Sequence, residues 1–290
     1  EVYGLDGTPA AATPFAVTKH TYEIRRLQPR ITSGKNPLRG SFLTIPTETH
    51  EHQYERAASD PRFIQSLALV VDAYGTVTRS ATVAYERRGT PPHAEQTTAL
   101  CIVSDLSVSH LDDASGYRLA IPHVGQTFQL TGLSATGTTP ASPAAVDAAF
   151  TSASTLGYHQ TPSGGLQKRL VEHVKLRYFD TGALPAPLAF GSADFRAIVF
   201  ETYQLDSTSD LLTQVDGNVT STILTEGGYV PLTGESGNWI PSGVALPDAS
   251  KFYLPTTFTD PFGKTTTIAY DAHVLQVASV TDALSNVVTA

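Results

Sequence analysis

The most suggestive spacing of metal-binding side chains is His50-Glu51-His52, in which two histidines are separated by one residue. In a β-strand, side chains two residues apart share a face, so Glu48 would lie on the same face as both imidazoles. Such a set can hold a zinc ion, but the sequence fixes no third ligand. The segment is short and polar, so a solvated strand is favoured over a metal site.

Other acidic and nucleophilic residues lack the partners that chemistry requires. The pair Asp112-Asp113 lacks the alternating acidic residues of a calcium loop, so a polar turn is favoured. The segment Phe190-Gly-Ser-Ala-Asp lacks the closing glycine of a nucleophile elbow. Hydrolysis would need two carboxylates across a cleft, and the sequence cannot pair the candidates, which are Glu201, Glu226 and Glu235. We therefore assign no catalytic, cofactor-binding or metal-binding residue, and we expect a protein that is not an enzyme.

Two residues that occur once are expected to be structural. Cys101 has no cysteine partner and no adjacent base, so burial as a small apolar residue is favoured over a nucleophilic role. Trp239 could stack on a sugar in a glycan-binding module, but a single tryptophan between turns more often fills a core.

Composition limits the class of protein. The chain has 290 residues, of which 41% are hydrophobic and 16% charged, so it can bury a sizeable core. Its net charge of −8 and the absence of a run of basic residues argue against nucleic-acid binding. Apolar stretches such as 66–71 are too short to span a bilayer, so we expect no direct membrane contact. The lack of methionine, even at position 1, suggests a piece of a longer polypeptide.

Apolar residues recur mostly with a period of two between turn residues, which is typical of antiparallel strands. We predict strands at 18–27, 63–71, 77–85, 100–108, 127–130, 198–205 and 265–270. Turns are predicted at Leu5-Asp-Gly, Ala73-Tyr-Gly and Val215-Asp-Gly-Asn. One helix is predicted between Ser142 as N-cap and Gly157 as the stop.

The segment Arg169–Tyr178 fits either a helix or a strand, and strand spacing groups its cations. In a strand, one face would carry Arg169, Val171, His173, Lys175 and Arg177, whereas a helix would scatter the cations. We predict a long strand with one solvated, basic face.

A phrase of the form Thr-Asp-x-x-Gly/Ser occurs from Thr259 and again from Thr281. A phrase that recurs at a fixed step indicates a stacked structural unit rather than a catalytic motif. In Asp260-Pro-Phe-Gly263 the aspartate would cap the turn and the glycine would take a strained position. The step of 22 residues, from 260 to 282, accommodates about two short strands with their turns. We therefore expect a sheet that grows by hairpins, with its last strand as an exposed, fast-exchanging edge until further repeats follow. The segment Val71-Asp-Ala-Tyr-Gly75 is either a distant copy of this motif or a similarity that arose by chance.

The segment from Gly263 to Tyr270-Asp271 resembles one unit of the Rhs/YD repeat family. The upstream chain resembles the middle-to-C-terminal region of the B component of bacterial insecticidal Tc toxins. The phrases that carry this resemblance are Glu1-Val-Tyr-Gly-Leu-Asp-Gly, Tyr22-Glu-Ile-Arg-Arg-Leu-Gln-Pro29, Tyr54-Glu-Arg with Asp60-Pro-Arg, Val71-Asp-Ala-Tyr-Gly, Glu226-Gly-Gly-Tyr-Val and Asn238-Trp-Ile-Pro-Ser-Gly243.

This resemblance implies a mainly β fold of antiparallel twisted sheets, forming part of a curved β-shell with at most one or two short helices. It implies a secreted, non-enzymatic virulence protein that encloses a cytotoxic cargo. The implied partners are the C component, which shares the shell and carries the cargo, and the pore-forming A component, reached through a propeller that this chain lacks. A carbohydrate-binding or adhesin β-module of a surface protein is the alternative. Ser285 stands where the repeat usually has glycine.

Four consecutive regions are predicted. The first, 1–130, is β-rich, and 131–165 is a loop or linker with a possible short helix. The third, 166–258, is a second β-rich region, and 259–290 begins the Rhs/YD repeats.

Overall fold

The structure is a computed structural model that describes residues 1–4, 7–33, 39–55, 57–89, 91, 93–114, 116–215 and 218–290. The predicted turns at Leu5-Asp-Gly and Val215-Asp-Gly-Asn fall partly outside these residues. No helix among the described residues is long and apolar enough to cross a membrane.

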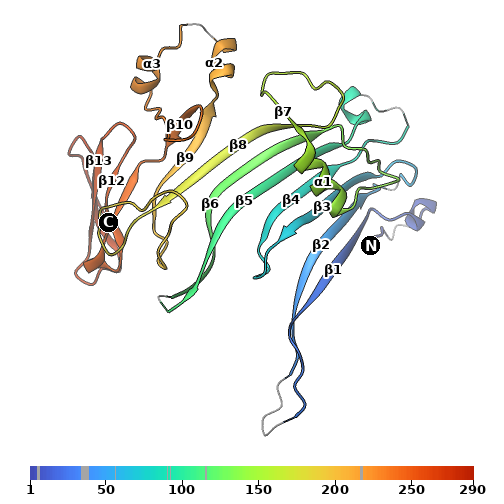
Figure 1. The fold of residues 1–290 in the computed structure, drawn as a ribbon, viewed down its shortest axis with the longest axis horizontal. Coiled ribbons are helices and arrows are strands. Elements are labelled where there is room, and N and C mark those ends of the chain that lie inside the picture. The colour runs from blue at the N-terminus through green and yellow to red at the C-terminus, as the bar shows by residue number, and fades with distance from the viewer. Residues whose placement is uncertain are drawn as a thin grey trace. The chain divides into compact units, whose positions relative to one another are not determined.

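Strands dominate the described chain (Figure 1). The strands are β1 (Ala16–Gln28), β2 (Ser41–Gln53), β3 (Arg62–Val71), β4 (Val77–Ala84), β5 (Leu100–Asp113), β6 (Gly116–Thr131), β7 (Ser154–Leu156), β8 (Gln167–Tyr178), β9 (Val199–Ser207), β10 (Asn238–Pro241), β11 (Val244–Asp248), β12 (Leu254–Thr259), β13 (Thr265–Tyr270), β14 (Val277–Thr281) and β15 (Val287–Thr289). The helices are α1 (Pro143–Ser152), α2 (Ser209–Val215) and α3 (Ser221–Glu226), with 3-10 turns at Pro9–Ala12, Ala94–Thr97 and Ala249–Lys251. The predicted fold class, mainly antiparallel β with few short helices, is confirmed.

Strand pairing follows chain order almost throughout. One sheet runs β1-β2-β3-β4-β5-β6-β8-β9-β10, with β7 beside β8, and a second runs β11-β12-β13-β14-β15. All the described pairs are antiparallel except β7 with β8. Every predicted strand is present, and the predicted strand at 265–270 has the bounds of β13. Of the long strand β2 only the short segment 50–52 was predicted, and most of β6 and the short strands β7 and β10 to β12 were not predicted.

The predicted helix begins where expected and ends early. Ser142 is the N-cap, because its hydroxyl accepts from the amide of Ala145 at 3.3 Å, and Pro143 follows at the first helical position. The helix ends at Ser152 rather than near Gly157, and 154–156 forms the short strand β7. The run of serine and threonine after 150 lowers helix propensity and favours extended backbone.

The segment 209–226 contains two short helices that were not predicted, one more helix than the expected maximum. Thr220 caps α3, since its hydroxyl accepts from the amide of Ile223 at 3.3 Å. These helices span only seven and six residues, so they are too short for a clear 3.6-residue period in the sequence.

Backbone contacts divide the chain into two units. The first consists of 1–105 with 127–171, and the second of 106–126 with 172–290. The units are therefore built from interleaved segments, whereas the predicted regions are consecutive, and those regions remain a prediction.

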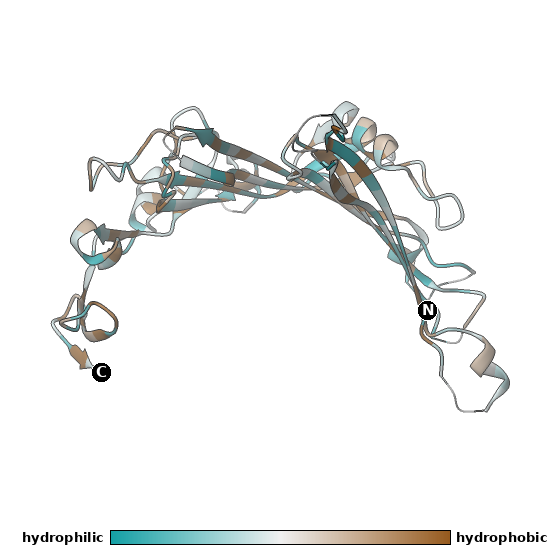
Figure 2. Cartoon of the chain, turned by 90° about the horizontal axis from the view of Figure 1, so that it is seen from below, coloured by the Kyte–Doolittle hydropathy of each residue, from teal (hydrophilic) through white to brown (hydrophobic). Residues whose placement is uncertain are grey.

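In the first unit, α1 covers one face of the sheet (Figure 1). Its Val146 and Phe150 are 0% and 3% exposed and belong to the same core as strand residues that alternate with a period of two. These are Phe63 and Leu67 of β3, Ala81 and Val83 of β4, Cys101 and Val103 of β5, and Leu130 of β6. Hydrophobic and hydrophilic segments alternate along the strands in Figure 2.

The second unit has two smaller cores. Ile121, Tyr178 and Ala197 form one, and Tyr203, Leu232 and Trp239 form the other. The phenolic hydroxyl of Tyr178 donates to the carbonyl of Pro122 at 2.5 Å, so this buried ring is also fixed by its polar end.

Candidate functional site

A buried polar cluster lies in the first unit at the position of the predicted metal-binding residues. Its centre is Gln65, which is 0% exposed and occupies an alternate position of β3 between Phe63 and Leu67. The Gln65 carboxamide nitrogen donates to the Glu48 carboxylate at 2.6 Å. The His50 ring is hydrogen-bonded to the same carboxylate, and its Nε2 atom lies 3.3 Å from the Gln65 nitrogen.

The same cluster anchors the segment that leads into α1, residues 132–142, which we call the strap. Gln65 donates to the Ala141 carbonyl at 2.9 Å and accepts from the Tyr85 hydroxyl at 2.5 Å, which in turn accepts from the Ala141 amide at 2.9 Å. Glu86 accepts from the Gly137 amide at 3.0 Å. The bonds of Gln65 and Tyr85 satisfy groups that burial would otherwise leave unpaired, whereas the second carboxylate oxygen of Glu86 is buried without a hydrogen-bond partner among the described residues.

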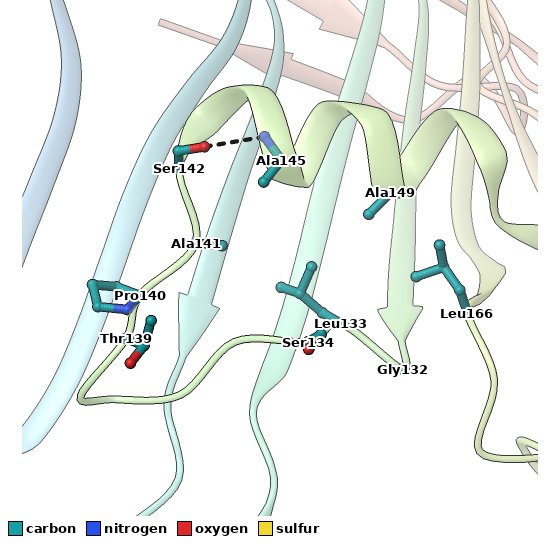
Figure 3. Close-up of a pocket in the computed structure, with 10 residues that line it drawn as sticks. All are labelled: Gly132, Leu133, Ser134, Thr139, Pro140, Ala141, Ser142, Ala145, Ala149 and Leu166. Atoms are coloured by element: carbon teal, nitrogen blue, oxygen red, sulfur yellow. Dashed lines mark hydrogen bonds between the residues drawn. The ribbon is translucent and has the colours of Figure 1, made fainter.

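The strap and α1 enclose a cavity of about 410 Å³ (Figure 3). Its lining is mostly apolar and small, with Leu133, Ala145, Ala149 and Leu166 pointing inward in the close-up. The only hydrogen bond drawn among the lining residues is the Ser142 cap to Ala145. No charged side chain lines this cavity, so its chemistry is that of a packing gap beneath the helix.

The segment His50-Glu51-His52 is a strand, as predicted, and lies within β2, but the prediction that it is solvated is wrong. His50 and Glu48 keep only 17% and 19% of their side-chain surface exposed, and His52 stacks on Phe63 with centroids 4.2 Å apart. The three side chains share a face as predicted, but the side chains of Phe63 and Gln65 on β3 pack against them. Within the described residues, no group of three or more histidine, cysteine, aspartate or glutamate side chains is placed to hold a metal ion.

Three histidines are held towards the neutral form by burial. Desolvation lowers the pKa of His52, His123 and His173 from the ordinary value of 6.5, and positive neighbours at His50 and Arg88 add to the effect at His52. His123 and His173 are 3% and 8% exposed.

These lowered pKa values predict a loss of stability on mild acidification. In the unfolded chain these histidines bind protons near pH 6.5, whereas in the folded chain they bind protons only at lower pH. Their contribution to the free energy of unfolding is therefore complete above pH 6.5 and declines as the pH falls below it. Each unit of depression corresponds to about 1.4 kcal/mol. We expect the urea midpoint to fall between pH 7.5 and 5.5, and His173→Phe to reduce that fall. His273→Gln, at an exposed position, should leave it unchanged, and a midpoint independent of pH would contradict the assignment.

The predicted solvated, basic face of β8 is also wrong, although β8 is a strand. His173 is 8% exposed and packs edge-on against Trp239, with centroids 4.8 Å apart. Lys175 forms an ion pair with Glu235 and lies over the Phe190 ring, 5.0 Å from its centroid. Arg177 donates to the Leu188 carbonyl at 2.7 Å. Residues from outside β8 therefore cover this face from His173 to Arg177, whereas Val171 remains 49% exposed.

Trp239 fills a core, as predicted. It is 0% exposed beside Tyr203 and Leu232, so its ring cannot stack on a sugar from solvent. Its indole nitrogen is buried without a hydrogen-bond partner in the structure.

The remaining chemical candidates are not assembled into a site. Cys101 is 1% exposed, and burial raises the pKa of its thiol to about 12, which confirms its structural role. Asp112 and Asp113 are the last residues of β5 rather than parts of a turn. Of the three carboxylates considered for hydrolysis, Glu235 forms an ion pair with Lys175. Glu201 lies on β9, and Glu226 is the last residue of α3.

The repeated phrase folds as predicted, and it recurs more often than predicted. At Asp260 the carboxylate accepts from the amides of Phe262 and Lys264 at 2.9 and 2.8 Å, and Gly263 has φ +75°. At Asp282 it accepts from Leu284 and Asn286 at 2.9 and 2.8 Å, and Ser285 has φ +67°.

The earlier phrase at Asp72 forms the same turn. The Asp72 carboxylate accepts from Tyr74 and Thr76, both at 2.9 Å, and Gly75 has φ +87°. A fourth version, one residue longer, begins at Asp271, with Val274 at φ +57°. The phrase at Asp72 is thus a genuine structural copy, and each of these four aspartates closes a hairpin between consecutive strands.

The left-handed position of these turns predicts opposite effects of two substitutions. Gly263→Val places a β-branched residue at φ +75°, so we expect unfolding of the second unit to become easier by about 1 to 3 kcal/mol. Ser285→Gly relieves the same conformation at φ +67° and should stabilise the last hairpin or leave it unchanged. Thermal unfolding and amide exchange of β13 to β15 measure both; equal midpoints for Gly263→Val and the parent chain would show that this turn is not strained.

The strand β15 is the last member of its sheet and pairs only with β14 among the described strands. Its three residues are exposed, with Val287 and Val288 at 59% and 72%, and the strand next to the C-terminus is hydrophobic in Figure 2. We expect its amides to exchange at least about a hundredfold faster than those of β4, whose neighbours lie on both sides. Hydrogen exchange followed by mass spectrometry resolves the two strands, and similar protection of both would contradict the edge assignment.

Comparison with known proteins confirms the resemblance to the Tc toxin B component, whereas the resemblance to an Rhs/YD repeat stays a prediction. Residues 1–120 match the family described as the insecticide toxin TcdB middle/C-terminal region. A comparison with curated proteins found no significant match.

Solved structures of Tc toxins share the fold over nearly the whole chain. A chain of the Photorhabdus luminescens Tc holotoxin pore is 21% identical, with a TM-score of 0.73 over 99% of this chain and 14% of that chain. The crystal structure of TcdB2-TccC3 is 21% identical, with a TM-score of 0.66 over 98% of this chain and 15% of that one. This chain therefore spans about a seventh of the length of those chains.

Proposed function

We propose that this chain is a non-enzymatic segment of the wall of a β-shell, within the B component of a secreted, insecticidal Tc-type toxin complex. The observation that carries the proposal is the fold shared with the Tc holotoxin chain over 99% of this chain, together with the family match over 1–120. In such a complex the wall would hold and help deliver a cytotoxic cargo.

The internal structure supports a role as wall. Consecutive strands pair with their sequence neighbours through aspartate turns, so the sheet β11 to β15 grows one hairpin at a time as an Rhs/YD repeat would. The residues with catalytic potential serve packing instead, since Glu48 and His50 anchor the strap and Glu235 neutralises Lys175. A wall needs rigidity rather than an open cleft.

The proposed partners follow from the solved relatives. One of these relatives is a complex of TcdB2 with TccC3, and another is a holotoxin pore. We accordingly infer a C component as the partner that completes the shell and carries the cargo, and an A component as the pore. The carbohydrate-binding alternative receives no support from Trp239, which is 0% exposed.

Protease protection of the cargo tests the proposal. The full-length protein that contains this chain is expressed with a C-type component, and the cargo is exposed to protease with and without the shell. Ile268→Asp combined with Val280→Asp places two carboxylates directly opposite each other on β13 and β14, which should open this part of the wall. The control is Leu275→Asp, at a turn residue that is 80% exposed.

Protection in the parent protein and the control, with loss of protection in the double variant, supports the wall role. A cargo that is digested equally fast with and without the intact partner contradicts encapsulation. Hydrolytic activity purified with this chain would contradict the non-enzymatic assignment.

A further inference from the structure

Among the strands that the structure describes, none flanks the outer half of the β1–β2 pair on either side. β2 pairs with β3 only over Glu48–Gln53, whereas β1 and β2 continue together over Tyr22–Gln28 and Ser41–Pro46. We call this two-stranded part the ribbon; in Figure 1 it extends past the ends of β3 and β4. Among the described pairings, both of its edges therefore keep backbone groups available for another strand.

One face of the ribbon is already covered. Arg25 donates to the carbonyls of Val71 and Asp72 at 3.3 and 2.9 Å, which ties the ribbon to the Asp72 turn. Leu43 lies so close to Gly75 that a Cβ there would be 2.9 Å from its Cδ2 atom. Ile45, on the same face, is 2% exposed. The ribbon is thus held in place by the first unit.

The opposite face is open and apolar. The register pairs Tyr22 with Pro46, Ile24 with Thr44 and Arg26 with Phe42, so these six side chains share a face. Tyr22, Ile24 and Phe42 are 55%, 66% and 60% exposed. Three large apolar side chains so exposed on one small face indicate a surface that another molecule covers.

The ribbon also carries a charge opposite to that of the protein. The ribbon itself contains Arg25, Arg26 and Glu23, a net charge of +1, and the adjoining residues 29–33 and 39–40 add Arg30 and Arg39, which brings the local net charge to +3, while the whole chain has −8. Glu23 is paired with Arg25, and the other three arginines, at 26, 30 and 39, are exposed. A second copy that docked through this same surface would bring like charge to it, whereas an acidic partner would be attracted.

From these observations we propose that the ribbon binds an extended polypeptide strand whose side chains alternate and include both apolar and acidic residues. The strand adds to the free edge of β1 by backbone hydrogen bonds, which is strand addition. Its apolar side chains lie beside Tyr22 and Ile24, and a carboxylate lies beside Arg26. The inference does not depend on the shell role, because it concerns a surface of this chain alone.

Peptide binding to the 290-residue chain tests this inference. The probes are the fluorescein-labelled heptapeptide Val-Thr-Val-Thr-Glu-Thr-Glu and its reversed sequence, which cover both strand directions. We expect at least one of them to bind saturably with Kd below about 1 mM in low salt, measured by fluorescence anisotropy. A version with lysine in place of glutamate should bind at least about tenfold more weakly. A peptide with methylated backbone nitrogens should also bind at least about tenfold more weakly, because it cannot donate hydrogen bonds to the β1 edge.

Variants locate the site on the ribbon. Ile24→Thr and Arg26→Glu should each weaken binding at least about fivefold. Both positions are exposed, so circular dichroism should show an unchanged fold, and Arg26→Gln provides a milder second variant. The matched control is Leu284→Thr, at an apolar residue that is 83% exposed in the other sheet's last turn, and it should bind as the parent does.

Three results would overturn the inference. The first is binding that is insensitive to peptide charge or to N-methylation. The second is a dimer in sedimentation equilibrium that Ile24→Thr abolishes, which would assign the ribbon to a second copy. The third is tighter binding of a single-stranded heptanucleotide than of either peptide, which would assign the arginines to nucleic acid.

Discussion

Replacing Gln65 by leucine should lower the free energy of unfolding of the first unit by about 3 kcal/mol or more. Leucine fits the apolar positions around it but leaves the Tyr85 hydroxyl, the Ala141 carbonyl and the Glu48 carboxylate without their partner. A buried polar group left unpaired costs about 1 to 3 kcal/mol. The strap should also loosen, so amide exchange in 132–142 should accelerate more than exchange in β5.

The control is Ser66→Ala, on the exposed side of the same strand, which should change stability by less than about 0.5 kcal/mol. Tyr85→Phe removes only one hydroxyl from the hydrogen-bond network, so its loss of stability should lie between those of Ser66→Ala and Gln65→Leu. Denaturation followed by exchange on individual peptides distinguishes a local from a global effect. If Gln65→Leu were as stable as the parent chain, the polar cluster would not hold the strap.

Trp239→Ala should destabilise the second unit by about 3 to 5 kcal/mol, the range for removing a large buried aromatic side chain. The indole packs against His173 and belongs to a core with Tyr203 and Leu232, so its loss leaves a cavity. Trp239→Phe should cost much less, because it keeps a ring and removes an indole nitrogen that has no partner.

Ile240→Ala, at the next residue with 43% exposure, is the matched control and should have a small effect. The parent chain contains only this tryptophan, so its fluorescence reports directly on the second unit. A parent emission typical of a solvated indole, or a Trp239→Ala variant with unchanged stability, would contradict the assigned burial.

Local chemistry in the sequence determined the turns and most of the strands. An aspartate followed three residues later by glycine or serine forms the same hairpin at Asp72, Asp260 and Asp282, because the carboxylate bonds to amides only two and four residues away. Period-two alternation likewise predicted β3, β4 and β13. These features depend on neighbours along the chain, so a single sequence shows them. The family resemblance rested on longer phrases and was confirmed by the family match and the shared fold.

The tertiary structure decided which faces are buried and which polar residues belong to the core. His50 and the cations of β8 were expected in solvent, yet side chains of β3 pack against the first and residues from 188 to 239 pack against the second. The position of Gln65 between Phe63 and Leu67 in an alternating strand indicates that its side chain faces the core. Its hydrogen-bond partners could not be predicted, because residues 48, 85 and 141 are far apart in sequence. The two-residue period of a strand determines on which face of the sheet a side chain lies. Whether that face is buried depends on segments that are far away along the chain, and these leave no pattern in the local sequence.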